Sequence, residues 1–305
     1  MAISAVMVKM LRDKTGAGML DCKGALEETN GNIDEAEKIL RKKGLAAAAK
    51  KAGRVAAEGL VGYKVEAGVA ALVELNCETD FAGRTDQFNK ARHSLAELVL
   101  HTDALGDFLD GDVEKVKALP APKHFPCAAG TVAESLQAFT AETGENMQMR
   151  RFARLVAGEG SAFTLYAHPG DKTVVVIETK GMPDDLSKDL AMHVAALAPQ
   201  FANRDGVSAK ALADEREIAR AKAVAAGKPE SVADKMVEGM IGKWFGEVVL
   251  LDQAFAKDDS KKVSQVIAER AGADASVVRF VRFKVGEGIE RKSGDFAAEV
   301  AALIK

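Results

Sequence analysis

The spacing of apolar residues divides this chain into a helical start, a centre that alternates strands with helices, and a helical hairpin. Near the start, three short amphipathic segments are separated by Gly16–Gly18 and by the Asn30–Gly31 turn. Asn32 and Glu35 have capping-box spacing and predict a third helix, which we expect to stop near Gly44. We expect the first helix to pack through an apolar stripe made of Val6, Met7, Met10 and Leu11.

The centre of the chain repeats one pattern, in which two strands joined by a turn precede a helix. The first copy has strands at 60–65 and 69–76, and the second has strands at 162–167 and 173–179. Two such hairpins, each followed by an amphipathic helix, predict an α+β fold with antiparallel sheets covered on one face. A further strand is expected at about 147–155.

Two charged helices are predicted after Phe201, at 208–226 and from the Gly227–Pro229 break to about Trp244. Because their connection is so short, they should lie antiparallel. A weak coiled-coil seam is predicted by the heptad spacing of Ala211, Leu212, Ile218 and Ala219. A last amphipathic helix is expected at 295–304.

These patterns divide the chain into four parts. We expect a helical bundle with a basic linker at 1–54, a first core half at 55–143, a second core half at 144–284 and a C-terminal module at 285–305. The predicted helical hairpin falls at about 207–244, within the sequence of the second core half.

Composition and charge favour a cytoplasmic protein. The 305 residues are 48% hydrophobic, which is enough for two or three cores. A net charge of −3 excludes a generally basic, nucleic-acid-coating protein. No apolar stretch approaches the ~18 residues that span a bilayer, and the start resembles neither a signal peptide nor a transit peptide. The three cysteines are far apart, which predicts a reducing compartment.

One local segment is strongly basic. All charges from Arg41 to Arg54 are positive and surround a run of alanines. Alone, this segment would fit an RNA or another anionic surface. It lacks the interleaved aromatic residues that stack on bases, so an alanine-rich linker helix with a solvated face is favoured over direct nucleic-acid binding.

A presented site is predicted where the apolar strand 69–75 runs into Thr79, Asp80, Phe81 and Ala82. A rigid strand can hold the following side chains in a fixed direction, and Asp80 with Phe81 offers a carboxylate beside a hydrophobic wedge. The alternative is structural: Thr79 or Asp80 caps the next helix and Phe81 packs beneath it. Spacing alone favours this structural alternative.

Catalysis by the chain itself is not predicted. Cys77 lies near Asp80, but no histidine is identifiable as its base. The five histidines are dispersed without metal-ligand spacing, and His193 is expected in the core. The GxxxxGK[ST] phosphate-binding motif is also missing. We therefore expect no cofactor, no metal site and no direct nucleotide binding.

The order of several motifs resembles the translation elongation factor Ts family over nearly the whole chain. The first is LRDKTGAGMLDCKGAL at 11–26, followed by TDF at 79–81. The others, in order, are KKAGRVAAEG (50–59), GEN with an arginine pair (144–151), AMHVAA (191–196), GKP with KMVEGM (227–240), and VGEGIE with DFAAEVAAL (285–303).

The resemblance implies a ubiquitin-associated-like N-terminal bundle, a two-subdomain core, a projecting helical hairpin and a GTPase partner, elongation factor Tu. It also implies partner-contact residues: Met19, Leu20, Lys23, Thr79, Asp80, Phe81, Ala82, His168, Met236 and Val237. The alternative for Met19 and Leu20 is plain helix packing, and the alternative for Lys23 is a solvated charge. The chain departs from the family at Ala82, where valine is common, and at Pro169, where glycine is often found.

The sequence therefore predicts a guanine-nucleotide exchange factor that releases GDP from elongation factor Tu without being an enzyme itself. In this hypothesis Phe81 wedges between partner side chains and Asp80 disturbs the magnesium and phosphate site. Two alternatives remain: an adaptor that binds a protein without releasing nucleotide, and an RNA-binding ribosome-associated factor that uses the basic segment.

Overall fold

The computed structural model describes residues 3–15, 17–225 and 230–290. Internal contacts divide the chain into two compact units. The first contains Met1–Lys64, Ala71–Arg154 and the chain from Lys284 onward, and the second contains Val65–Ala70 and Leu155–Phe283. The fold is α+β, as predicted, and its described strands form two three-stranded sheets and a two-stranded one. No described helix is both long enough and apolar enough to cross a membrane.

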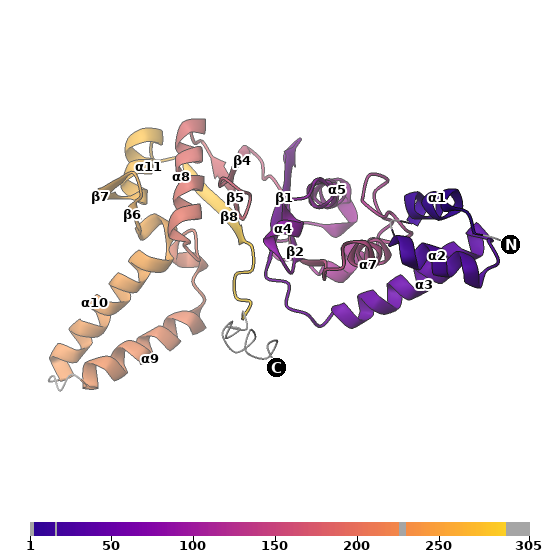
Figure 1. Ribbon diagram of the computed structural model, residues 1–305. Coiled ribbons are helices and arrows are strands. Elements are labelled where there is room, and N and C mark those ends of the chain that lie inside the picture. The colour runs from indigo at the N-terminus through magenta and orange to yellow at the C-terminus, as the bar shows by residue number, and fades with distance from the viewer. Residues whose placement is uncertain (1–2, 16, 226–229, 291–305) are drawn as a thin grey trace. The chain divides into compact units, whose positions relative to one another are not determined.

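Three helices form the N-terminal bundle of the first unit: α1 (Ala5–Thr15), α2 (Met19–Glu28) and α3 (Ile33–Lys51). They lie together around the N-terminus in Figure 1. Their shared core contains the fully buried side chains of Leu11 and Leu26. Asn32 caps α3, because its Oδ1 accepts a hydrogen bond from the backbone nitrogen of Glu35 at 3.1 Å. The predicted three-helix bundle is confirmed.

The predicted apolar stripe of α1 is wrong at two of its four positions. Val8 and Leu11 are the buried residues of α1, whereas Val6 is 67% exposed and Met10 is 56% exposed. All of these residues are apolar, so periodicity allows more than one inward face. The packing of α1 against α2 and α3 selects the face that carries Val8 and Leu11.

Helix α3 does not stop near Gly44 but continues to Lys51, so the basic linker is its second half. Gly44 marks a close helix crossing instead of a helix end. A Cβ atom added at Gly44 would lie 3.1 Å from the Cβ of Ala141 on α7 (Val132–Thr143). The glycine therefore lets α3 approach α7 closely and ties the bundle to the rest of its unit.

The first sheet contains β1 (Glu58–Glu66), β2 (Val69–Cys77) and β3 (Gln148–Val156) in the order β1-β2-β3. Strand β3 confirms the further strand expected near 147–155. Helix α5 (Asp86–His101) packs directly on β1, because a Cβ atom at Gly62 would lie 2.1 Å from the carbonyl oxygen of Arg92. In Figure 1, α5 and α7 lie between this sheet and the bundle.

Between α5 and α7 the chain forms a 3-10 turn (Asp103–Leu105), helix α6 (Val113–Lys117) and a loop that contains Pro120, Pro122 and Pro126. Buried Arg154 on β3 fixes this segment. Its guanidinium donates to the carbonyl oxygen of Gly106 at 2.9 Å and pairs with Asp103 at 2.5 Å.

The second unit is built on β4 (Ser161–Ala167), β5 (Thr173–Lys180) and β8 (Ser276–Lys284), in the order β4-β5-β8. Strands β4 and β5 form an antiparallel hairpin, with Ser161 opposite Lys180 and Ala167 opposite Val174. Helix α8 (Asp184–Leu197) packs on both strands. This arrangement confirms the second predicted hairpin and its covering helix.

The remaining elements of this core are the 3-10 turns Arg204–Gly206 and Leu250–Asp252, the two-stranded sheet β6 (Ala254–Phe255) and β7 (Asp258–Lys262), and helix α11 (Val263–Ala271). Apolar residues of α8, β5 and α11 share one buried cluster, which includes Ile177, Leu186, Leu190 and Ile267. His193 of α8 is 1% exposed, so its expected place in the core is confirmed.

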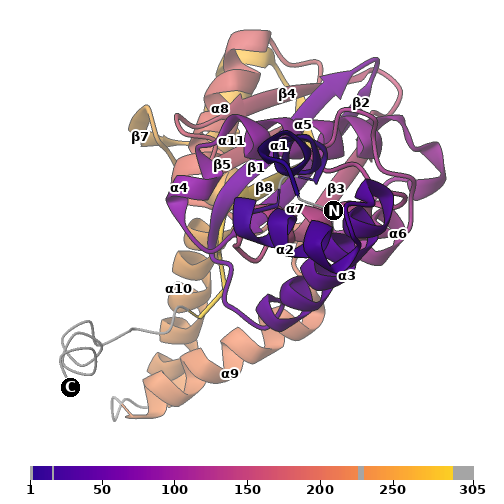
Figure 2. The ribbon, with the colours of Figure 1, turned by 45° about the vertical axis from the view of Figure 1, so that its right-hand side comes forward.

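Helices α9 (Ala209–Ala225) and α10 (Glu230–Val248) form the predicted hairpin and lie side by side in Figures 1 and 2. Helix α10 continues beyond the predicted end near Trp244. The seam is also only partly as predicted, since Ile218 is 47% exposed. Its buried residues are Ala219, Ala223, Ala233, Val237 and Ile241, with Leu212 packed against them.

A buried carboxylate fixes the chain just after β8. Glu74 of β2 is fully buried and accepts hydrogen bonds from Arg150 at 3.1 Å, Arg151 at 2.6 Å and the backbone nitrogen of Gly286 at 2.8 Å. Gly286 has a φ of +72°, and an added Cβ atom would lie 2.3 Å from the carbonyl oxygen of Ala57. The helix predicted at 295–304 lies outside the described residues.

Candidate functional site

Strand β2 leads directly into the Thr79–Ala82 loop that the sequence analysis singled out. The strand is buried along almost its whole length because it is the middle strand of its sheet, so its end is a rigid support. Thr79 caps the one-turn helix α4 (Asp80–Gly83), since its hydroxyl oxygen accepts a hydrogen bond from the backbone nitrogen of Ala82 at 3.4 Å. The capping role considered for Thr79 is confirmed.

Two residues that follow α7 hold this loop from the side. Glu145 accepts two hydrogen bonds from Thr79, one from its backbone nitrogen at 3.0 Å and one from its hydroxyl at 2.6 Å. The backbone nitrogen of Asn146 donates to the carboxylate of Glu78 at 2.7 Å. The side-chain amide of Asn146 donates to the carbonyl oxygen of Arg54 at 2.7 Å, which also ties the loop to the end of α3.

The side chain of Phe81 projects into solvent and is 77% exposed. The structural alternative in which Phe81 packs beneath the helix is therefore wrong. Gly83 is the buried residue of α4, and a Cβ atom added to it would lie 3.7 Å from the Cα of Gly59 and 3.7 Å from the thiol of Cys77. Because the inward position of this single turn belongs to Gly83, Phe81 is directed outward.

Asp80 lies beside Phe81 and is only partly exposed. Its Oδ2 pairs with Nη2 of Arg84 at 2.6 Å, one helical turn along the chain. This pair keeps the carboxylate in a fixed direction, although an ion pair with an exposed arginine is weak and exchangeable. The loop thus presents an unshielded aromatic ring next to an oriented carboxylate, followed by half-buried Ala82.

The N-terminal bundle presents a second apolar surface at the start of α2. Met19 is 48% exposed and Leu20 is 86% exposed, so neither residue is used mainly for packing within the bundle. Lys23 is also exposed and pairs with Glu27 at 3.7 Å. Because two large apolar side chains lie together in solvent with a charge one turn away, this surface is suited to contact with another protein.

His168 lies in the turn between β4 and β5 of the second unit. Its backbone nitrogen donates to the carbonyl oxygen of Thr173 at 2.9 Å, and its own carbonyl oxygen accepts from Asp171 at 2.9 Å. The ring Nδ1 lies 3.0 Å from the hydroxyl of Tyr166. The turn therefore holds His168 in an exposed and defined position, with Pro169 accommodated in it.

The predicted contact residues of the helical hairpin differ in exposure. Val237 is 7% exposed and belongs to the seam between α9 and α10. Met236 is half-buried and packs against the same seam. Only Met236 therefore has side-chain surface that a partner can reach without separating the two helices.

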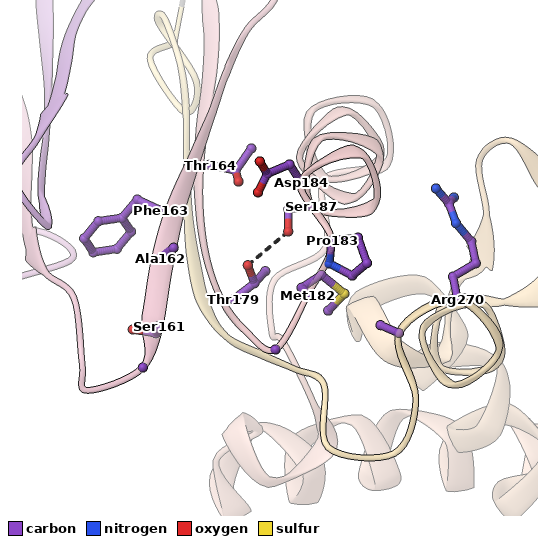
Figure 3. Close-up of a pocket in the computed structure, with 13 residues that line it drawn as sticks. Ser161, Ala162, Phe163, Thr164, Thr179, Met182, Pro183, Asp184, Ser187 and Arg270 are labelled. Carbon is purple, nitrogen blue, oxygen red and sulfur yellow. Dashed lines mark hydrogen bonds between the residues drawn. The ribbon is translucent and has the colours of Figure 1, made fainter.

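A cavity of about 470 Å³ lies in the second unit, next to β4 and the start of α8. Figure 3 shows that Phe163, Thr179, Pro183 and Arg270 are among the residues that line it. The hydroxyls of Thr179 and Ser187 lie 3.0 Å apart and bond to each other. Arg270 pairs with carboxylates of α8 at 2.6 and 3.0 Å. Because these groups are already engaged within the protein, we place no reactive site in this cavity.

The cysteines also carry no sign of reactivity. The Cys77 thiol is buried and donates to the carbonyl oxygen of Thr79 at 3.0 Å. Burial, together with a hydrogen bond to Glu142, raises the pKa of the Cys127 thiol to about 12, so this thiol stays protonated at neutral pH. Within the described part of the chain, no group of three or more histidine, cysteine, aspartate or glutamate residues is placed to hold a metal ion.

The predicted contact residues thus lie on several separate surfaces. The Thr79–Ala82 loop and the Met19–Lys23 surface belong to the first unit, whereas His168 and Met236 belong to the second. Glu145 and Asn146 were missed as site residues. The GEN motif contains both of them and was the available signal, but only the fold shows that they meet Glu78 and Thr79.

Comparison with known proteins shows the family of the chain. The family model described as elongation factor TS matches residues 78–287, more than half of the chain. A protein named elongation factor Ts from Syntrophotalea carbinolica is 45% identical over 314 residues, with both chains fully covered. Its namesake from Xanthobacter autotrophicus is 47% identical and covers 99% of this chain and 98% of its own.

A helical bundle, an α+β core and full-length similarity to these relatives define the class of the chain, which is a translation elongation factor. Within that class, the chain belongs to the elongation factor Ts family.

Proposed function

We propose that this protein is a guanine-nucleotide exchange factor that binds the GTPase elongation factor Tu and promotes the release of its GDP. The observation that carries the proposal is the Thr79–Ala82 loop, hereafter the exchange loop. It extends from a buried strand, is capped at Thr79, and leaves Phe81 77% exposed beside Asp80. A large aromatic side chain held in water by a fixed backbone is costly unless it is buried in a complex.

The chemistry requires no covalent step. In a GTPase, Mg²⁺ bridges the phosphates and neutralises their charge, so the loss of its support weakens nucleotide binding. Phe81 would insert between partner side chains near this site, and the Asp80 carboxylate would disturb the magnesium and phosphate environment. The protein would act as a binding partner of a GTPase and not as an enzyme with its own substrate.

The size of the effect requires more than one contact. Weakening GDP ~10⁴-fold takes about 5.5 kcal/mol of coupling free energy, whereas burying one phenylalanine supplies about 1.5–3 kcal/mol. The remainder would come from a broad interface, for which Met19, Leu20 and Lys23 in the bundle and His168 in the second unit offer exposed contacts. In the hairpin, Met236 would contact the partner while Val237 supports it from the seam.

Thermodynamic linkage makes the interaction reciprocal. If this protein weakens GDP binding by a given factor, GDP must weaken the binding of this protein by the same factor. A new nucleotide therefore displaces the exchange factor, which can then act again. We further propose that this cycle takes place in the cytoplasm, without a cofactor and without direct contact between this protein and nucleic acid.

The test is the release of a fluorescent GDP analogue from purified elongation factor Tu, with excess unlabelled GDP present. Substoichiometric amounts of this protein should accelerate release, and each molecule should turn over many times. If the protein binds elongation factor Tu stably but does not accelerate release, it is an adaptor and the proposal is wrong. Tight RNA binding that weakens steeply with salt would favour a ribosome-associated role instead.

A further inference from the structure

The carboxylate of Glu145 matches the two donors that Thr79 presents at the start of the exchange loop. One carboxylate oxygen accepts from the Thr79 backbone nitrogen at 3.0 Å, and the other accepts from the Thr79 hydroxyl at 2.6 Å. An ionised carboxylate is an acceptor at both oxygens, so it can satisfy an N–H and an O–H group at once. Hydrogen bonds to a charged acceptor are also stronger than those between neutral groups.

This contact fixes the hydroxyl that caps α4. The Thr79 oxygen accepts from the backbone nitrogen of Ala82 at 3.4 Å while its hydrogen points to Glu145. A helix of a single turn has too few internal hydrogen bonds to be stable by itself. The direction of Phe81, two residues after Thr79, therefore depends on how firmly Thr79 is held.

Glu145 is itself presented by a rigid corner of the chain. Gly144 ends α7 in the left-handed conformation with a φ of +78°, and Asn146 is only 3% exposed. Asn146 donates to Glu78 through its backbone and to the end of α3 through its side chain. Apart from the bond to Glu78, the backbone around Glu145 is thus held by α7 and the end of α3 and not by the exchange loop, as suits a group that positions another.

We propose that Glu145 is a positioning residue for nucleotide exchange: it acts through Thr79 to hold Phe81 in its projecting direction. The proposal rests on the proposed function, because it assigns a role in the same loop. Glu145 would not need to touch the partner. Its contribution is preorganisation, which lets the aromatic ring enter the partner without first ordering the loop.

The expected kinetic effect is a fall in the maximal exchange rate. Glu145→Ala removes the charged acceptor of both Thr79 donors, and hydrogen bonds to charged groups are the stronger ones. We therefore expect Glu145→Ala to lower kcat for GDP release about tenfold. KM should change by less than about threefold, because most of the interface lies elsewhere. Thr79→Ser, which keeps both donors, should retain most of the activity.

Glu142 offers a matched control. It lies three residues before Glu145, is exposed, and accepts hydrogen bonds from Gln87 and Cys127 instead of from the loop. Glu142→Ala should leave kcat unchanged. A double-mutant cycle adds specificity: in a Thr79→Val background, Glu145→Ala should lower kcat less than it does in the wild-type protein, because only the bond from the backbone nitrogen is left to lose.

A partner-free measurement separates this proposal from the proposed function. Trp244→Phe removes the natural tryptophan of the chain. Phe81→Trp then places a tryptophan on the exchange loop, and its time-resolved fluorescence anisotropy reports the motion of the loop. Adding Glu145→Ala should increase the fast motion of this tryptophan, whereas Glu142→Ala should not.

The two measurements together give distinct outcomes. Faster motion with a lower kcat supports the positioning role. Unchanged motion, or faster motion with an unchanged kcat, overturns it, even if the wild-type protein remains an active exchange factor. If the wild-type protein does not accelerate release at all, the proposed function fails and the positioning role fails with it, whatever the anisotropy shows.

Discussion

Single residues in this protein differ widely in how deeply they are buried: the side chain of His193 lies in the core, whereas that of Phe81 lies in solvent. The His193 ring is 1% exposed, stacks on Phe255 with ring centroids 5.9 Å apart, and bonds to Gln253 at 2.9 Å. Its Nδ1 accepts from the backbone nitrogen of Ala256 at 3.1 Å. Because Nδ1 is an acceptor here, the ring must be neutral in this arrangement.

Stability should therefore fall in mild acid. Burial lowers the pKa of His193 below its ordinary value, although the bond to Gln253 opposes the shift. The unfolded chain then binds more protons than the folded chain once the pH drops below about 6.5. This contribution is complete above that pH and is lost as the pH falls towards the folded pKa, at no more than about 1.4 kcal/mol per pH unit.

Urea denaturation at pH 7.5 and 5.5 measures this dependence. His193→Gln should flatten the difference in the free energy of unfolding between the two pH values, even if it lowers stability at both. An equally steep dependence in the variant would show that other groups cause the loss.

At the scale of elements, close approaches of backbone place the helices. Gly62 on β1 has an ordinary φ, yet an added Cβ atom would lie 2.1 Å from the carbonyl oxygen of Arg92 on α5. Gly44 likewise lets α3 approach Ala141 of α7. These glycines are needed for space, and the contacts set the distance between each helix and its neighbour.

Gly62→Ala should accordingly move α5 away from the sheet and destabilise the first unit by about 1–3 kcal/mol, the usual cost of overpacking. Gly239 on α10 is the matched control, since no atom lies within 4 Å of its added Cβ. Gly239→Ala should be neutral or stabilising by about 0.5–1 kcal/mol, because alanine favours helix. Thermal unfolding of both variants checks this, and equal melting temperatures would contradict the packing argument.

The exposed residues at the start of α2 should contribute to the affinity for elongation factor Tu but not to the stability of the folded protein. Leu20 is 86% exposed, so Leu20→Ala should change the free energy of unfolding by less than about 0.5 kcal/mol. Its loss from the interface should weaken the affinity for elongation factor Tu about tenfold. Val6→Ala on α1, also exposed, is the control. Surface plasmon resonance measures the affinity of both variants for elongation factor Tu. Equal affinities would contradict the proposed contact through the bundle.

Sequence patterns predicted the helices and strands of this fold more accurately than the faces that they bury. Strands β1 to β5, the three-helix bundle and the hairpin follow from apolar spacing and turn residues. The inward face of α1 does not, because Val6, Val8, Met10 and Leu11 are all apolar and only the packing of α2 and α3 selects among them. The continuation of α3 beyond Gly44 could not be predicted either, since the residues near Gly44 do not indicate that Ala141 lies opposite it.

The candidate site shows the same division. Thr79 could be predicted as a helix cap from its type and position. The exposure of Phe81 could not, because it depends on Gly83 taking the inward position of α4 against Gly59, a residue of another strand. Glu145 was beyond reach for a similar reason, as it is 66 residues from Thr79 along the chain.

At the scale of the whole molecule, the proposed exchange activity would use both compact units. The first unit carries the exchange loop and the bundle surface, and the second carries His168 and the hairpin. No single side chain on these surfaces would supply the coupling that the proposed exchange needs, because burying one side chain contributes about 1.5–3 kcal/mol. Loss of one contact should therefore weaken one step of the proposed nucleotide exchange and leave the other contacts in place.

The most direct test compares the wild-type protein with Phe81→Ala in the release of fluorescent GDP from elongation factor Tu. Because Phe81 is exposed, the variant should fold normally and still be captured by the partner. Its maximal release rate should fall by about ten- to a hundredfold, as expected when about 1.5–3 kcal/mol of coupling is lost. A variant that releases GDP as fast as the wild-type protein would contradict the central claim that the exchange loop acts through Phe81.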